Sequence, residues 1–335
     1  DVTVYQTWIP RAALELALSL EADRIARLTF DPAIVERERR VVRSERRLCV
    51  DDNPAALLSE RVQAAAFVAH SYRFPTIGLP EDIGSWRLGD LRKFYRAYYA
   101  PGNQTFVIAG DVEADRALAL ARKLLEPIAP REPPPEVRTR EPRQLGERRV
   151  VIERQGHTPL LQYAYKAPAA SDRRAPALRL LLAALVDGDA SRLHRRLVED
   201  RKIAVEVSGE WHEGFDPALF WLHLMLPEGA DTSVARRMLD AELARIVEEG
   251  ITPAELERAK SLNAVQHFRQ LATLDGKAHL LGEYEVLRGG WRALLDAPQR
   301  LDAVTRTEVQ AVAREVLDPR RRCSGVLEPT RHGRA

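Results

Sequence analysis

The chain has 335 residues, 45% of them hydrophobic, and its 51 lysines and arginines nearly balance its 49 aspartates and glutamates. This length corresponds to about two domains, with enough apolar residues for buried cores. The net charge of +2 does not indicate nucleic acid binding, and no apolar stretch is long enough to span a membrane. Two cysteines, Cys49 and Cys323, exclude a disulfide framework and a thiolate metal site.

The first half begins with the signals of a strand and two helices. Residues 2–9 are strand-like, and residues 11–28 have the pattern of an amphipathic helix. A second helix is predicted to start at Asp31-Pro32. Aspartate is a favoured N-cap, and proline suits the first helical position because its missing N–H is not needed there.

A proline-rich stretch separates the two halves. Six prolines stand between Glu126 and Arg149 amid alternating charges, a composition that favours an extended, semi-rigid connector over a packed element. The elements predicted on either side are strands at 104–109, 149–152 and 160–164 and helices at 113–125, 175–185 and 192–199.

The second half repeats part of the first. Residues 31–37, Asp-Pro-Ala-Ile-Val-Glu-Arg, match residues 252–258, Thr-Pro-Ala-Glu-Leu-Glu-Arg, at an offset of 252 − 31 = 221. A strand-like segment at 218–226 and an amphipathic helix at 231–249 precede the second copy, in the same order as in the first. This recurrence indicates duplicated α/β domains.

Glu38 and Glu45 are the most informative pair of charged residues. They stand seven residues apart, nearly two helical turns, so both carboxylates lie on one helical face. Because their surroundings are dense in alternating charge, spacing alone also allows a solvated face held by i,i+4 pairs. The repeat has Ala259 and Gln266 at the matching positions, which favours a role confined to the first half.

Four short motifs carry a family resemblance. They are His70-Ser71-Tyr72, Tyr99-Ala100-Pro101-Gly102-Asn103 with Gly110-Asp111, Ser191-Arg192-Leu193, and Thr252-Pro253-Ala254-Glu255-Leu256. In this order and spacing they resemble pitrilysin/insulinase-type zinc peptidases, most closely the branch of mitochondrial processing peptidase and its bacterial two-subunit relatives. The resemblance implies an α+β fold with two homologous domains, each a mostly antiparallel sheet packed with helices. These domains would cover residues 1–128 and 149–330, joined by the proline-rich linker 129–148.

The same resemblance assigns roles to the acidic pair. The family holds zinc with two histidines of a His-x-x-Glu-His helix and a glutamate that ends a downstream Glu-Arg-x-x-Val-x-x-Glu segment. Residues 38–45 match that segment. Glu45 is thereby implied as the third zinc ligand, and Glu38 as a supporting acid that orients the site.

The histidine motif itself is missing. No His-x-x-Glu-His occurs, and no two of the eight histidines are four residues apart: His70, His157, His194, His212, His223, His267, His279 and His332. Because few residues precede Glu38, we expect an N-terminally truncated member that lacks two zinc ligands and is inactive as given. His212-Glu213 has no partner histidine, and we interpret it as a loop pair.

A second family feature, an Arg/Tyr pair in the second domain, is replaced by valines. Many members place an arginine and a tyrosine seven residues apart in the second domain, where they bind substrate and stabilise the oxyanion. The matching positions hold Val198 and Val205, and neither side chain donates a hydrogen bond.

Together these features imply the zinc-bearing subunit of a metalloendopeptidase. Its intact form would hydrolyse peptides or short unfolded polypeptides in a chamber, as a homo- or heterodimer with a homologous subunit that bears the Arg/Tyr pair. A non-catalytic core-type or assembly subunit of the same fold stays open, as does a regulatory binding protein. The sequence does not decide between bacterial cytoplasm and periplasm.

Overall fold

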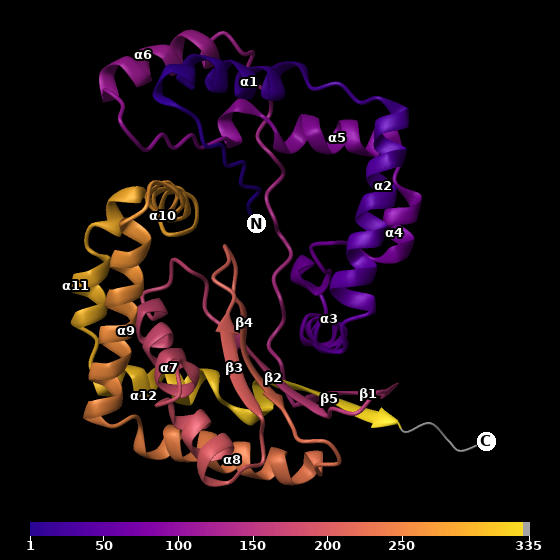
Figure 1. Cartoon of the computed structure of the whole chain (residues 1–335), viewed down its shortest axis with the longest axis vertical. Coiled ribbons are helices and arrows are strands. Elements are labelled where there is room, and N and C mark those ends of the chain that lie inside the picture. The colour runs from indigo at the N-terminus through magenta and orange to yellow at the C-terminus, as the bar shows by residue number, and fades with distance from the viewer. Residues whose placement is uncertain (331–335) are drawn as a thin grey trace. The chain divides into compact units, whose positions relative to one another are not determined.

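A computed structural model describes residues 1–330 (Figure 1). Interleaved stretches of the chain build two compact units. The helical unit comprises residues 1–46, 77–138 and 268–294, and the sheet unit comprises residues 47–76, 139–267 and 295–330. Within residues 1–330, no helix has the length and apolar character needed to cross a lipid bilayer.

The helical unit consists of helices and loops. Its helices are α1 (Leu14–Arg27), α2 (Pro32–Arg46), α4 (Pro80–Ser85), α5 (Leu88–Tyr98), α6 (Ala114–Leu125) and α10 (Leu274–Leu287). Within this unit α1 packs against α6, and α2 packs against α4.

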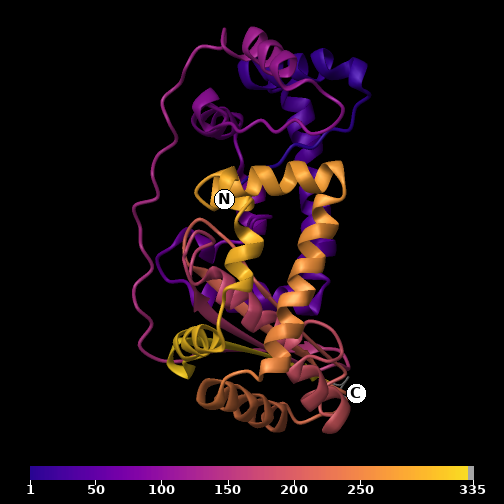
Figure 2. The same ribbon diagram turned by 90° about the vertical axis from the view of Figure 1, so that its left-hand side faces the viewer.

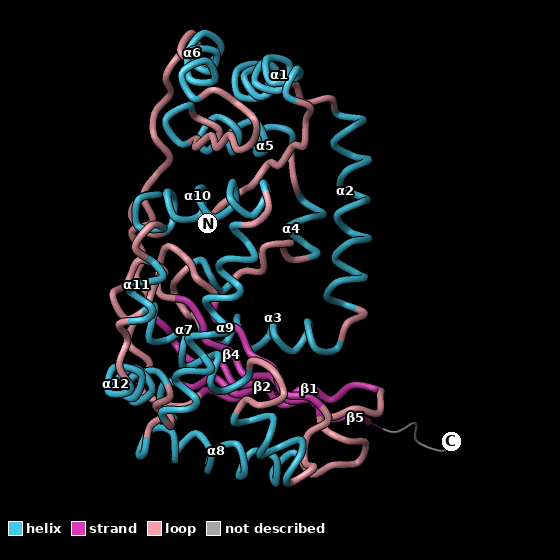
Figure 3. Tube along the Cα trace, turned by 60° about the vertical axis from the view of Figure 1, so that its left-hand side comes forward, coloured by secondary structure: helices cyan, strands magenta, loops and turns pink. Residues whose placement is uncertain are grey.

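The sheet unit contains one five-stranded mixed sheet. Its strands are β1 (Arg148–Gln155), β2 (Leu160–Ala167), β3 (Glu206–Trp211), β4 (Ala218–Met225) and β5 (Arg322–Thr330), in the order β1-β5-β2-β4-β3. The edge strand β1 runs parallel to β5, and all other neighbours are antiparallel. In Figure 3 the strands gather in this sheet. The C-terminal strand β5 is therefore central, although it lies last in the sequence.

Helices cover both faces of the sheet. On one face, β2 and β4 bury a core that includes Tyr163, Tyr165 and Phe220. The helices that surround this core are α7 (Ala175–Val186), α8 (Thr232–Glu249), α9 (Pro253–Leu271), α11 (Ala297–Asp302) and α12 (Arg306–Val316), with a π-helical stretch at His194–Asp200. The opposite face is covered by α3 (Pro54–Ala66), whose Leu58 and Val62 are fully buried against it.

The predicted pair of homologous domains, each with its own sheet, is wrong. All five strands of the described residues belong to the single mixed sheet, and the helical unit has none. The predicted strands at 2–9 and 104–109 are not formed. A strand requires a hydrogen-bonded neighbour, and neither segment pairs with another part of residues 1–330.

The duplicated helix starts are confirmed. Both α2 and α9 begin at the matching prolines, Pro32 and Pro253. The Asp31 carboxylate accepts the N–H of Ala33 at 2.7 Å, and the Thr252 hydroxyl accepts the N–H of Glu255 at 3.2 Å. These caps satisfy amides that have no partner in the first helical turn.

The proline-rich stretch has no regular structure. Residues 129–147 contain neither helix nor strand, and Figure 2 shows them as an extended trace. Their prolines cannot donate to a helix or a sheet ladder.

Candidate functional site

The acidic pair lies on one helix, as expected from its spacing. Glu38 and Glu45 are both exposed on α2. Glu38 accepts a hydrogen bond from the Arg37 guanidinium at 3.3 Å, whereas Glu45 makes no hydrogen bond or ion pair with any residue the structure describes. Glu45 is therefore free to bind a ligand from solution.

Two arginines fix the rotation of α2. Arg39 and Arg46 are also seven residues apart, each one position after an acid of the pair. The Arg39 guanidinium donates to the carbonyls of Ile83 (2.8 Å) and Trp86 (2.7 Å). Arg46, only 3% exposed, donates to the carbonyl of Gly78 at 2.7 Å. These bonds hold one face of α2 against residues 78–86 and leave the neighbouring face, with Glu45, open.

Packing accounts for the loss of one of the two acids in the repeat. Ala259 on α9, the counterpart of Glu38, is fully buried in the core of the sheet unit. A glutamate there would be a charge buried without a partner, which is strongly unfavourable. Burial therefore explains why the second copy lacks an acid at the position of Glu38. Gln266, the counterpart of Glu45, is exposed, so burial does not explain the loss of the second acid.

The donors present do not hold zinc on their own. Within residues 1–330, no three His, Cys, Asp or Glu side chains come together as metal ligands. A catalytic zinc takes three protein ligands, so these residues do not form such a site among themselves. Of the eight histidines, His332 lies outside the described residues.

The two valines lie in the sheet unit. Val198, in the π-helical stretch, is half-buried and packs against the core. Val205, just before β3, is 57% exposed, and its backbone N–H bonds the Met225 carbonyl at 2.8 Å. Their side chains contribute packing and no hydrogen bonds.

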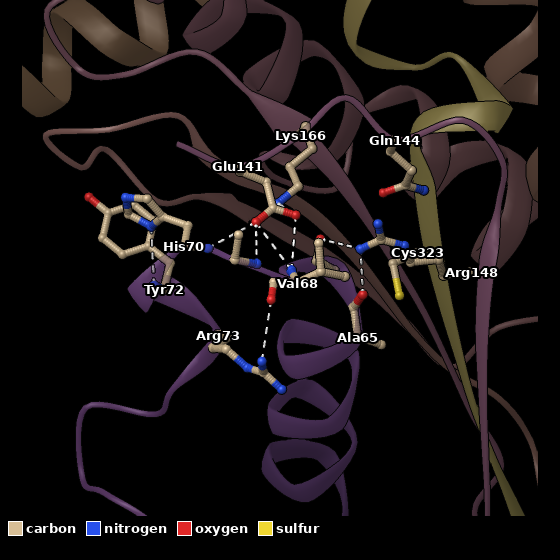
Figure 4. Close-up of polar contacts among 12 residues, drawn as sticks. Ala65, Val68, His70, Tyr72, Arg73, Glu141, Gln144, Arg148, Lys166 and Cys323 are labelled. Atoms are coloured by element: carbon tan, nitrogen blue, oxygen red, sulfur yellow. Dashed lines mark hydrogen bonds and ion pairs between the residues drawn. The ribbon is translucent and has the colours of Figure 1, made fainter. Parts of the chain in front are cut away.

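Sequence patterns did not reveal a buried polar cluster in the sheet unit, shown in Figure 4. We call it the Glu141 cluster: Glu141, Lys166 and the backbone amides of residues 68–70. The Glu141 carboxylate accepts the N–H groups of Val68, Ala69 and His70, each at 3.0 Å. Burial raises the pKa of Glu141, but these three donors and Lys166 outweigh it and bring the pKa below its usual value.

Lys166 on β2 is the cation of this cluster. Its side chain is 11% exposed, and its Nζ lies 3.7 Å from Glu141 Oε1 and 3.0 Å from the centroid of the Phe67 ring. Burial lowers the pKa of Lys166 to about 7, although the Glu141 carboxylate favours the charged form. The ammonium makes an ion pair but no hydrogen bond within the described residues.

His70 is fully engaged beside this cluster. Its Nδ1 accepts the N–H of Tyr72 at 3.2 Å, so the proton sits on Nε2, which donates to Asp216 at 3.1 Å. The ring is buried. With both nitrogens occupied, His70 serves packing and offers no metal ligand.

The loop interpretation of His212-Glu213 agrees with the structure. Both residues follow the end of β3. The N–H of His212 bonds the Leu219 carbonyl at 3.0 Å, and Glu213 accepts the Arg179 guanidinium at 2.6 Å. The pair closes the loop between β3 and β4.

Comparison with known sequences gives related proteases. A family profile described as "Peptidase M16 inactive domain" matches residues 85–263. The zinc protease PqqE of Helicobacter pylori is 29% identical over 293 residues, which cover 85% of this chain and 65% of that protein. The uncharacterized zinc protease Rv2782c of Mycobacterium tuberculosis is 28% identical over 340 residues, which cover 99% of this chain and 75% of that protein. The chain thus spans less than two thirds of the length of PqqE.

Solved structures resemble this one. A protease from Helicobacter pylori has a TM-score of 0.91 at 26% identity, covering 96% of this chain and 78% of that one. A peptidase M16 inactive domain from Pseudomonas fluorescens has a TM-score of 0.83 at 21% identity, covering 94% and 75%. The second likeness concerns the fold alone.

Proposed function

Since the chain belongs to the peptidase M16 family, we propose that it forms part of a zinc-dependent endopeptidase subunit that hydrolyses peptides or short unfolded polypeptides. Its relatives include proteins named zinc proteases. Glu45 is the ligand that this chain contributes, and Glu38 supports it. The proposal needs further ligands besides Glu45, because within residues 1–330 no three His, Cys, Asp or Glu side chains come together as metal ligands.

The observation that carries the proposal is the state of Glu45. It stands exposed on a helix rich in arginine, yet without an ion-pair partner among the described residues, whereas Glu36 and Glu38 are paired with Arg39 and Arg37. The bonds of Arg39 and Arg46 to backbone carbonyls hold α2 in one rotation. A carboxylate kept unpaired on a fixed helix is preorganised to bind a cation.

The sheet unit has a different part in this proposal. Val198 and Val205 provide no donor for a developing oxyanion. A second homologous subunit with an Arg/Tyr pair would therefore complete the active enzyme, and the two subunits would enclose the peptide.

A zinc titration of the complete gene product tests the ligand assignment. Glu45→Gln keeps the shape of the side chain but removes its charge, so zinc affinity should fall at least tenfold, and peptidase activity with it. Glu38→Gln should have a smaller effect, because its carboxylate acts through its neighbours. The matched control is Glu257→Gln, an exposed glutamate at the repeat position of Glu36 on α9, which should bind zinc as the wild type does.

A non-catalytic partner or assembly subunit is the second candidate. The observation that favours it is the match of residues 85–263 to an inactive-domain profile. Under this alternative the complete gene product binds no zinc, and Glu45→Gln changes neither zinc binding nor the activity of a mixture with its partner subunit. Equal zinc affinities of the wild type and Glu45→Gln would overturn the catalytic assignment.

A further inference from the structure

The Glu141 cluster joins the proline-rich stretch to the sheet unit. Glu141 stands within residues 129–147, where no helix or strand fixes the backbone. Its side chain is 12% exposed, which is unusual for an acid in such a segment. The contacts of this side chain therefore attach the stretch to the sheet unit at residue 141.

The backbone N–H groups that contact Glu141 lie at the end of a helix and need a hydrogen-bond acceptor. Val68, Ala69 and His70 follow directly after α3, which ends at Ala66 with Phe67 as its C-cap. Their N–H groups all donate to the Glu141 carboxylate, and Figure 4 shows Val68 and His70 on the side of Glu141. Hydrogen bonds to an ionised acceptor are about twice as strong as neutral ones, and Lys166 adds an opposite charge 3.7 Å away.

Two further tethers bracket the attachment. Gln144, 7% exposed, donates through Nε2 to the Arg322 carbonyl at 2.7 Å. At the other end, in the helical unit, Arg131 donates to the Ile25 carbonyl at 2.7 Å. Residues 132–140 make no hydrogen bond or ion pair with any residue that the structure describes.

We propose that Glu141 is a latch that sets the free length of the proline-rich segment, which is one of five places where the chain passes between the helical unit and the sheet unit. With the latch closed, the free span is residues 132–140. With it open, the span extends to residue 143, where Gln144 holds the chain. Three added residues lengthen this free segment by about 9 Å when it is extended, as proline-rich chains are. The latch does not depend on zinc or on the proposed peptidase activity.

Limited trypsin digestion of the chain tests this directly. The bond after Arg143 lies between the two tethers of the sheet unit, and the bond after Arg138 lies in the free span. In Glu141→Ala, cleavage after Arg143 should accelerate at least tenfold, while cleavage after Arg138 stays unchanged and serves as the internal reference. Glu141→Gln keeps an acceptor oxygen, so its rate of cleavage after Arg143 should lie between those of the wild type and Glu141→Ala. Glu136→Ala, an exposed acid in the same stretch, is the matched control and should behave as the wild type.

Hydrogen exchange separates a latch from a general loss of structure. The amides of residues 68–70 should exchange at least tenfold faster in Glu141→Ala, while the amides in the middle of α3 keep their protection. Two results would overturn the proposal. One is wild-type cleavage and exchange in Glu141→Ala. The other is loss of protection throughout α3, because Glu141 would then be part of the folded core.

Discussion

Replacing Gly325 with valine is expected to break the packing of α3 on the sheet and to destabilise the sheet unit by about 3 kcal/mol. Gly325 lies in the central strand β5, opposite Gln162 of β2 and Val150 of β1. A Cβ atom there would stand 2.3 Å from Val62 Cγ2 and 3.1 Å from Leu58 Cδ1. Val62 is a buried valine on a helix and has one preferred rotamer, so it cannot move aside without a large cost in free energy. Urea denaturation measures the loss.

A double-mutant cycle shows whether the clash is with α3. Gly325→Ala should cost about 2 kcal/mol, and Val62→Ala about 2 kcal/mol through the cavity it leaves. The new methyl of residue 325 partly fills that cavity. The double variant should therefore be destabilised by about 1 kcal/mol less than the sum of the two single variants. Gly156→Ala, where a Cβ meets nothing within 4 Å, should stay within about 0.5 kcal/mol of the wild type. Strict additivity of the two changes would mean that Gly325 and Val62 do not contact each other.

Local signals in the sequence predicted local structure well. Asp31-Pro32 and Thr252-Pro253 start helices because the cap and the proline act within one turn. The strands β2 and β4 have eight residues each, most of them apolar, and form a buried antiparallel pair. The family resemblance rested on short motifs along the whole chain, and the profile match to residues 85–263 bears it out.

Features that depend on distant partners could not be predicted in this way. β5 contains Gly325 and Pro329, which disfavour strands, yet it is central because β1 and β2 pair with it on either side. The strand-like residues 104–109 show the reverse case, since no neighbour pairs with them within the described residues. The Glu141 cluster brings together residues 68–70, 141 and 166, and no sequence pattern connects them.

Lys166 is expected to make the stability of the sheet unit rise with pH above neutrality. Burial lowers its pKa from 10.5 to about 7 in the folded chain. Between these values the unfolded chain holds the proton while the folded chain has released it, so the free energy of unfolding increases with pH. One pKa unit corresponds to about 1.4 kcal/mol. From pH 7 to pH 9, the free energy of unfolding of the wild type should therefore rise by about 2 kcal/mol relative to that of Lys166→Met.

Urea titrations of both proteins at several pH values measure this difference. The comparison cancels groups that both proteins share, including Cys323, whose pKa burial raises to about 11. Lys202→Met is the control, since Lys202 is exposed in the same unit. Its free energy of unfolding should change with pH in parallel with that of the wild type. In Glu141→Gln the carboxylate that favours the charged amine is gone, so the pKa of Lys166 should fall below 7 and the rise in stability should begin at lower pH. Parallel curves for the wild type and Lys166→Met would show that the buried amine keeps its proton on folding.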